Sequence, residues 1–178
     1  PLIAMAKGAD KFDDCGKTLN HSLVVNVVFS IALMALTFSF SFLIPYLNQP
    51  KEVVREAIPY LQVLSLSVIP FILFQTYRQF LEGLSIPNPP MYIAIFANLF
   101  NAFFNWLFIF GNFGFPAWGL FGAGVATTIT RWTMSLTLLY FVLNYKKIKI
   151  YNPQIKIGKL DYSLIKKLIH IGLSSGFQ

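Results

Sequence analysis

The sequence predicts an all-α protein whose helices cross a membrane several times, that is, a polytopic helical membrane protein. Of its 178 residues, 56% are hydrophobic and only 12% are charged, whereas a soluble domain carries roughly 25% charged residues. Several apolar stretches run for about 20 residues, the length that a helix needs to cross the hydrocarbon core of a bilayer. Polar segments containing glycine and proline separate these stretches, as expected for loops between spans.

Four full spans and the start of a fifth are expected along the chain. The four spans are residues 22–44, 57–79, 91–110 and 120–144, and the fifth begins near residue 164. Residues 1–6 have the composition of the end of a preceding helix, and residues 7–20 are expected to form a polar turn. In the second span, Pro59 falls in the first turn, where proline is tolerated. Pro70 falls in the middle of that span and predicts a kink.

Basic residues are distributed unevenly between the two sets of loops. Eleven belong to the first, third and fifth polar segments or to the end of the second span: Lys7, Lys11, Lys17, Arg78, Lys146, Lys147, Lys149, Lys156, Lys159, Lys166 and Lys167. Lys51 and Arg55 fall on the other side. Because short cytoplasmic loops carry an excess of Lys and Arg, the odd-numbered polar segments are predicted to be cytoplasmic. The net charge of +7 then indicates contact with anionic membrane lipids, and no nucleic-acid partner is expected.

Three asparagines lie on one face of the uncharged stretch 91–110. Asn98, Asn101 and Asn105 are spaced by three and four residues, which keeps them within roughly a 60° arc of a helix. A stripe of amides facing lipid would be costly, because hydrocarbon offers no water to bond them. The stripe therefore faces other helices or a wet cavity. It serves either as hydrogen-bonding contact between helices or as the polar lining of a path for a substrate or ion.

Charged residues in or beside the spans are few. Arg131 is the only basic residue well inside a predicted span, where a charge costs at least ~2.5 kcal/mol unless it is paired, hydrated or reaches the interface. A structural role and a role in a cavity both remain open for it. Arg78 and Glu82 are four residues apart and are expected to pair on one helix face at the membrane boundary. That pair forms either a clamp at the helix end or part of a gate.

Catalytic and metal-binding chemistry have little support in the sequence. The single cysteine, Cys15, cannot form an internal disulfide. His21 and His170 lie at the edges of apolar runs, and no Asp, Glu or Cys is spaced to complete a metal site with them. No span carries paired carboxylates or a Ser/His/Asp set, so no enzyme, no metal and no organic cofactor are expected.

Five segments together resemble the multidrug and toxic compound extrusion (MATE) transporters of the bacterial NorM-like type. The segments are PLIAMAKGAD at 1–10, QPKEVVREAIPYL at 49–61, YRQFLEGLSIPNPPM at 77–91, NLFNAFFNWLFIFGNFGFPAWGLFGAGVATTITRW at 98–132 and IGLSSGFQ at 171–178. In the last of these, Ser174 stands where the family usually has proline. The resemblance extends over the whole chain, which starts at Pro1 and not at Met, and we expect it to be an internal piece of a longer protein.

The resemblance implies part of a twelve-helix fold with two six-helix lobes, from the end of the second helix to the start of the seventh. Residues 1–144 would belong to the N-terminal lobe, residues 145–163 to a basic cytoplasmic linker between the lobes, and residues 164–178 to the start of the C-terminal lobe. The remaining helices of the full-length transporter would then be partners of this chain.

The implied function is multidrug efflux, in which Na⁺ or H⁺ flows inward across the bacterial inner membrane while small organic cations are exported. In the family, polar groups of the fifth and sixth helices line a cavity, and Asn101, Asn105 and Thr127 fall on those positions. Some relatives carry Asp where Asn105 stands; an amide cannot carry a proton, but it can bond Na⁺ or a substrate. The family's acidic residues on the first and seventh helices would lie outside this chain.

Two other functions remain alternatives. A flippase for lipid-linked saccharides would need several basic residues in the cavity to meet phosphate, and Arg131 alone is a candidate. A membrane scaffold without transport activity would keep the asparagine stripe packed and dry.

Overall fold

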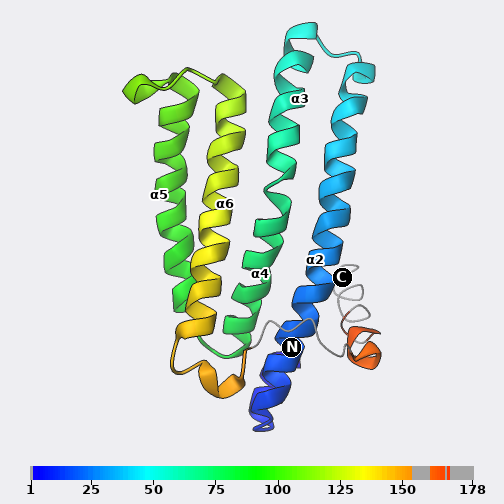
Figure 1. The fold of residues 1–178 in the computed structure, drawn as a ribbon, viewed down its shortest axis with the longest axis vertical. Coiled ribbons are helices and arrows are strands. Elements are labelled where there is room, and N and C mark those ends of the chain that lie inside the picture. The colour runs from blue at the N-terminus through cyan, green and yellow to red at the C-terminus, as the bar shows by residue number, and fades with distance from the viewer. Residues whose placement is uncertain (1, 154–160, 167, 169–178) are drawn as a thin grey trace.

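The computed structural model describes residues 2–153, 161–166 and 168, and every regular element within them is helical. The long helices stand side by side and follow one another up and down along the chain (Figure 1). The all-α fold class predicted from the sequence is therefore confirmed.

The chain begins with α1 (Leu2–Gly8) and continues after a short turn into α2 (Phe12–Phe40). A 3₁₀ helix, η1 (Ser41–Leu47), extends α2 at its far end. The prediction of a polar turn over residues 7–20 was wrong, because the helix resumes at Phe12. Asp13 and Asp14 lie in its first turn, where negative charge favours a helix N-terminus.

The second predicted span is broken into α3 (Lys51–Ser65) and α4 (Val68–Gly83), with a bend of 41° between their axes. The kink predicted from Pro70 is confirmed, and it lies one turn before the proline. Pro70 has no N–H to donate to the carbonyl of Leu66, and its ring crowds that carbonyl. Pro59 lies inside α3 and not in its first turn as predicted, because the helix already begins after Pro50.

The last two long helices form a closely packed hairpin. α5 (Asn88–Phe110) and α6 (Gly119–Asn144) are joined through the 3₁₀ turn η2 (Asn112–Gly114). A Cβ atom placed on Gly122 would lie 2.6 Å from the carbonyl oxygen of Phe108. Only glycine therefore allows the two backbones to approach this closely.

The helices contact their neighbours in a definite order. α6 packs against α5 on one side and against both α3 and α4 on the other, and α2 packs against α4. Figure 1 shows the resulting spatial order of the helices, which is α5, α6, the bent pair α3 and α4, and then α2. The main buried cluster lies toward the end of the molecule where α4 ends and α6 leads into η3 (Lys149–Tyr151). Its fully buried members include Phe80, Leu81, Leu138, Val142 and Ile148.

Length and apolar composition identify α2 with η1 and α5 as helices able to cross a membrane, and the bent pair α3 and α4 counts as a third. α6 has 26 residues, about 39 Å at 1.5 Å per residue, which is long enough to cross. Its polar residues include five threonines and Arg131. The predicted fifth span, which begins near residue 164, lies almost wholly outside the described residues. Residues 162–166, at its start, are helical.

Within the described part of the chain, the ends of the helices separate the basic residues of the loops as the charge count predicts, while Lys156, Lys159 and Lys167 lie outside it. α1, the turn from α4 to α5 and the segment after α6 lie at one end, and Lys51 begins α3 at the other (Figure 1). The Nζ of Lys7 donates to the carbonyl oxygen of Leu84 at 2.7 Å and to Oγ of Ser85 at 3.2 Å. This lysine therefore ties α1 to the end of α4.

The close contact between α5 and α6 predicts the effect of one added methyl group. Gly122→Ala would force the backbone of Phe108 to move, and overpacking of this kind costs about 1–3 kcal/mol. We expect a lower melting temperature for the purified protein in detergent, followed by tryptophan fluorescence. Gly8→Ala is the control, because no atom lies within 4 Å of the added Cβ. Equal melting temperatures for the two variants would contradict the close approach.

Candidate functional site

Two asparagines of α5 and one threonine of α6 form a connected polar set, here called the Asn–Thr set: Asn101, Asn105 and Thr130. Asn105 Nδ2 donates to Asn101 Oδ1 at 3.0 Å, across one turn of α5. Asn101 Nδ2 in turn reaches Oγ1 of Thr130 at 3.4 Å. Thr130 is buried and donates to the carbonyl oxygen of Ala126 at 2.8 Å. The set therefore links α5 to α6 through amide and hydroxyl groups without any charge.

The set ends in one buried acceptor. Oδ1 of Asn105 is out of reach of solvent and receives no hydrogen bond from any residue that the structure describes. An unsatisfied buried acceptor costs about 1–3 kcal/mol, and natural proteins seldom retain one without a use. A carbonyl oxygen of this kind can accept from an N–H or O–H donor or can ligate a hard cation.

Asn98 lies on the same face of α5 as Asn101 and Asn105, but its side chain has different neighbours. Its side chain is exposed and lines a groove of about 450 Å³ between α4 and α5. Arg78, Glu82 and Asn88 line the same groove, together with apolar residues such as Phe74. The predicted stripe of three asparagines is thus divided, with Asn101 and Asn105 bonded to each other and Asn98 apart from them.

The ion pair between Arg78 and Glu82 is present as predicted. Arg78 Nε lies 2.7 Å from Glu82 Oε1, with the two side chains 49% and 42% exposed. Exposed pairs one helical turn apart stabilise a helix by only a few tenths of a kcal/mol. The pair therefore contributes little to stability, and its main effect is to place charged groups in the lining of the groove.

Thr127 does not join the Asn–Thr set. Its Oγ1 donates to the carbonyl oxygen of Ala123 in its own helix at 2.9 Å. Thr130, three residues further along α6, is the threonine that Asn101 contacts. Both residues lie on the same side of α6, so the sequence could indicate the face but not which of the two hydroxyls meets the asparagines.

Arg131 is bound at the break between α3 and α4. Its Nη1 donates to Oγ of Ser67 at 2.7 Å, and its Cζ lies 4.8 Å from the centre of the Phe71 ring. Among the described residues, a hydroxyl and an aromatic face are thus the partners of this guanidinium. Thr128 adds a second link, because its Oγ1 lies 3.1 Å from the carbonyl oxygen of Val63.

Ser67 could not be recognised as a partner from its position in the sequence. It follows Ser65 in a stretch that reads as the middle of a span, and nothing in the spacing connects it with a residue 64 positions away. The one available signal was Pro70, because a proline frees a carbonyl on the preceding turn and so marks where polar partners gather.

An apolar groove is lined by residues of α5 and α6. It encloses about 280 Å³, and its walls include Phe96, Phe100, Phe104, Met134 and Thr130. Among the residues described, no three His, Cys, Asp or Glu side chains gather so that they could hold a metal ion. The polar groups available to a ligand at mid-helix are therefore amides and hydroxyls.

Comparison with known proteins identifies one family. The family model described as MatE matches residues 1–107. The multidrug resistance protein NorM of Photobacterium profundum is 36% identical over 149 residues, which cover 84% of this chain and 33% of the relative. NorM of Vibrio vulnificus is 30% identical over 179 residues, covering 94% of this chain and 39% of the relative.

A third relative gives the same result. The probable multidrug resistance protein NorM of Oceanobacillus iheyensis is 30% identical over 177 residues, which cover 99% of this chain and 40% of the relative. The chain spans about a third to two fifths of the length of these curated relatives. With its long apolar helices, it is an integral membrane protein. The chain belongs to the MatE family, whose members are membrane transporters and not enzymes.

Proposed function

We propose that this chain is part of an antiporter that exports small organic compounds, many of them cationic, across the inner membrane of a bacterium. Inward movement of Na⁺ or H⁺ drives the export. The family match and the names of the relatives, which are multidrug resistance proteins of bacteria, support this proposal. Residues 1–144 would form most of one lobe, residues 145–163 the cytoplasmic linker, and residues 164–178 the start of the second lobe.

The observation that carries the proposal is the unsatisfied carbonyl oxygen of Asn105. Its side chain lies in an uncharged helix long enough to cross the membrane, and its Oδ1 is buried without a donor among the described residues. A packed helix contact has no need of such an atom, because Asn101 already supplies the bond to α6. A ligand donor or a sodium ion would complete the coordination of this oxygen.

The bonds that attach α6 to α3 and α4 are compatible with an alternating-access mechanism. Arg131 and Thr128 bind α6 to the break between α3 and α4, so these three helices would move as one body when the lobes rock. The Asn–Thr set, which spans α5 and α6, would then change its exposure with the position of that body. The side chain of Arg131 is committed to Ser67 and Phe71, so this arginine does not supply the free basic group that a phosphate-binding flippase would need.

Ion coupling predicts a dependence of efflux on the sodium gradient. In an efflux-deficient bacterium that expresses the protein from its own gene, ethidium efflux should accelerate when an inward Na⁺ gradient is imposed at fixed pH. The measurement is the loss of ethidium fluorescence from preloaded cells. Acceleration by an inward proton gradient alone would assign the coupling to H⁺. The absence of efflux under both gradients, with normal amounts of protein in the membrane, would reject the proposed function.

Asn105→Ala is expected to slow efflux while leaving folding intact. Loss of one ligand bond of about 1 kcal/mol corresponds to roughly a fivefold lower initial rate. The matched control is Asn144→Ala, because Asn144 is exposed at the end of α6 and its Nδ2 donates only to the carbonyl oxygen of Tyr140, at 2.9 Å. Equal rates for the two variants at equal expression would remove Asn105 from the transport path.

Access of water to this position can be measured directly. With Cys15 replaced by serine and Asn105 by cysteine, a membrane-impermeant maleimide should label position 105, and an excess of a transported cation should slow the labelling. A cysteine placed at Leu138, which is fully buried, is the control that should stay unlabelled. Failure to label position 105 in active protein would favour the dry helix contact of a scaffold.

A further inference from the structure

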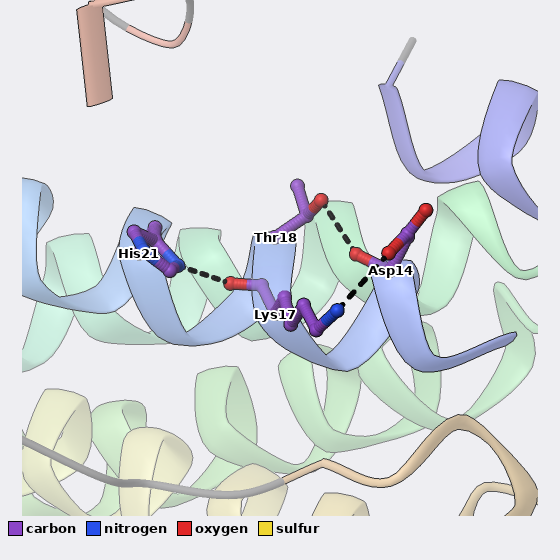
Figure 2. A network of polar contacts seen from close by, with 4 residues as sticks. All are labelled: Asp14, Lys17, Thr18 and His21. Atoms are coloured by element: carbon purple, nitrogen blue, oxygen red, sulfur yellow. Dashed lines mark hydrogen bonds and ion pairs between the residues drawn. The ribbon is translucent and has the colours of Figure 1, made fainter. Parts of the chain in front are cut away.

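His21 is a buried histidine of α2 that is hydrogen-bonded through both ring nitrogens. Its side chain is 6% exposed. Nδ1 lies 2.7 Å from the carbonyl oxygen of Lys17, one turn earlier in the same helix. Figure 2 shows the ring turned toward that carbonyl, beside the ion pair of Lys17 with Asp14. Nε2 lies 2.9 Å from the main-chain nitrogen of Asp161, 140 positions along the chain.

The two partners fix the protonation state of the ring. A carbonyl oxygen can only accept, so Nδ1 must carry a hydrogen. A main-chain N–H can only donate, so Nε2 must present its lone pair to Asp161. The arrangement therefore exists only for the neutral imidazole with the hydrogen on Nδ1. Adding a proton to Nε2 would set two N–H groups against each other and break the bond.

Asp161 stands at a structurally important point. Its Oδ1 accepts from the main-chain N–H groups of Ser163 and Leu164 at 2.9 and 3.4 Å, which is the N-cap arrangement for the helical residues 162–166. The carboxylate is thus occupied by the cap, and the main-chain N–H is the group that contacts His21. One residue both begins this helical segment and attaches it to α2.

Ionisable groups of both signs lie on α2 and on the elements that pack against it. α2 carries Asp13, Asp14 and Lys17 on the N-terminal side of the histidine, and Asp14 pairs with Lys17 at 3.5 Å. Segment 161–166 adds Asp161 and Lys166. The elements packed against α2 bring further ionisable groups to this end: Lys7 on α1, Tyr77, Arg78 and Glu82 on α4, and Lys149 and Tyr151 on η3. The carboxylates of Asp14, Glu82 and Asp161 are each engaged in an ion pair or cap.

We propose that His21 and the main-chain N–H of Asp161 form a proton-sensitive latch that holds segment 161–166 against α2 when His21 is neutral and releases it when His21 is protonated. Imidazole can take up a proton, and uptake of that proton by Nε2 of His21 would open the latch. The latch depends on this geometry alone and not on what the protein transports.

Hydrogen exchange measured by mass spectrometry tests the latch in the protein expressed from its own gene and reconstituted in lipid nanodiscs. Protection factors of the peptide containing residues 161–166, corrected for the intrinsic pH dependence of exchange, should fall about fivefold from pH 8 to pH 5.5. α4 should keep its protection, which shows that the fold is intact. Unchanged protection of the 161–166 peptide over this range would overturn the proposal.

Two histidine variants separate the latch from general effects of pH. His21→Gln offers an amide oxygen to the Asp161 N–H and does not titrate, so the protection of segment 161–166 should become independent of pH. His170→Gln removes the other histidine of the chain and should retain the fivefold fall. A fall in His21→Gln equal to that of the unmodified protein would assign the effect to another group.

A third variant distinguishes the main-chain bond from a side-chain ion pair. Asp161→Asn keeps an N-cap oxygen and the main-chain N–H but removes the carboxylate. If the main-chain N–H is the partner, the fall in protection on acidification persists in this variant. Its disappearance would show that His21 senses the carboxylate, and the proposed latch would be wrong.

Discussion

The lack of water in the hydrocarbon core forces each polar side chain of these helices to find a partner in the protein. Four of the five threonines of α6 donate to carbonyl oxygens of their own helix or of α3. Asn26 of α2 bonds Thr76 of α4 at 2.8 Å, and Arg131 bonds Ser67. These bonds fix which helices are neighbours, because apolar contacts alone distinguish poorly between helix faces in lipid. The unsatisfied oxygen of Asn105 stands out against this background.

Much of the fold could be predicted from sequence, because hydrophobic length and proline position act locally. α5 and α6 begin and end within three residues of their predicted bounds, and Pro70 marked the bend between α3 and α4. The start of α2 was missed, since the charged residues from Lys11 to Lys17 suggested a loop. They form a helix there because Cys15 and Leu19 bury one face against the neighbouring elements, and that packing cannot be read from composition.

The candidate site was predicted only in part, for a geometric reason. Helical spacing places Asn98, Asn101 and Asn105 on one face, but it does not show that neighbouring helices divide the face into a bonded pair and a groove. The resemblance to the family, and not the spacing, placed Thr127 beside the asparagines, whereas the hydroxyl that Asn101 contacts is that of Thr130, three residues further along α6. The pairing of Arg131 with Ser67 depends on two helices that meet only in the folded chain, so no local pattern could reveal it.

The bond between Arg131 and Ser67 also has a consequence for biosynthesis. Ser67 leaves the ribosome 64 residues before Arg131, and at 5–20 residues per second this is a delay of roughly 3–13 s. During that interval the broken span of α3 and α4 must enter the bilayer without the partner that later satisfies its break. The bent helix is thus a candidate for a membrane chaperone or for transient shielding by the insertion machinery until α6 arrives. A single arginine then binds a bend that Pro70 has already introduced into the earlier segment.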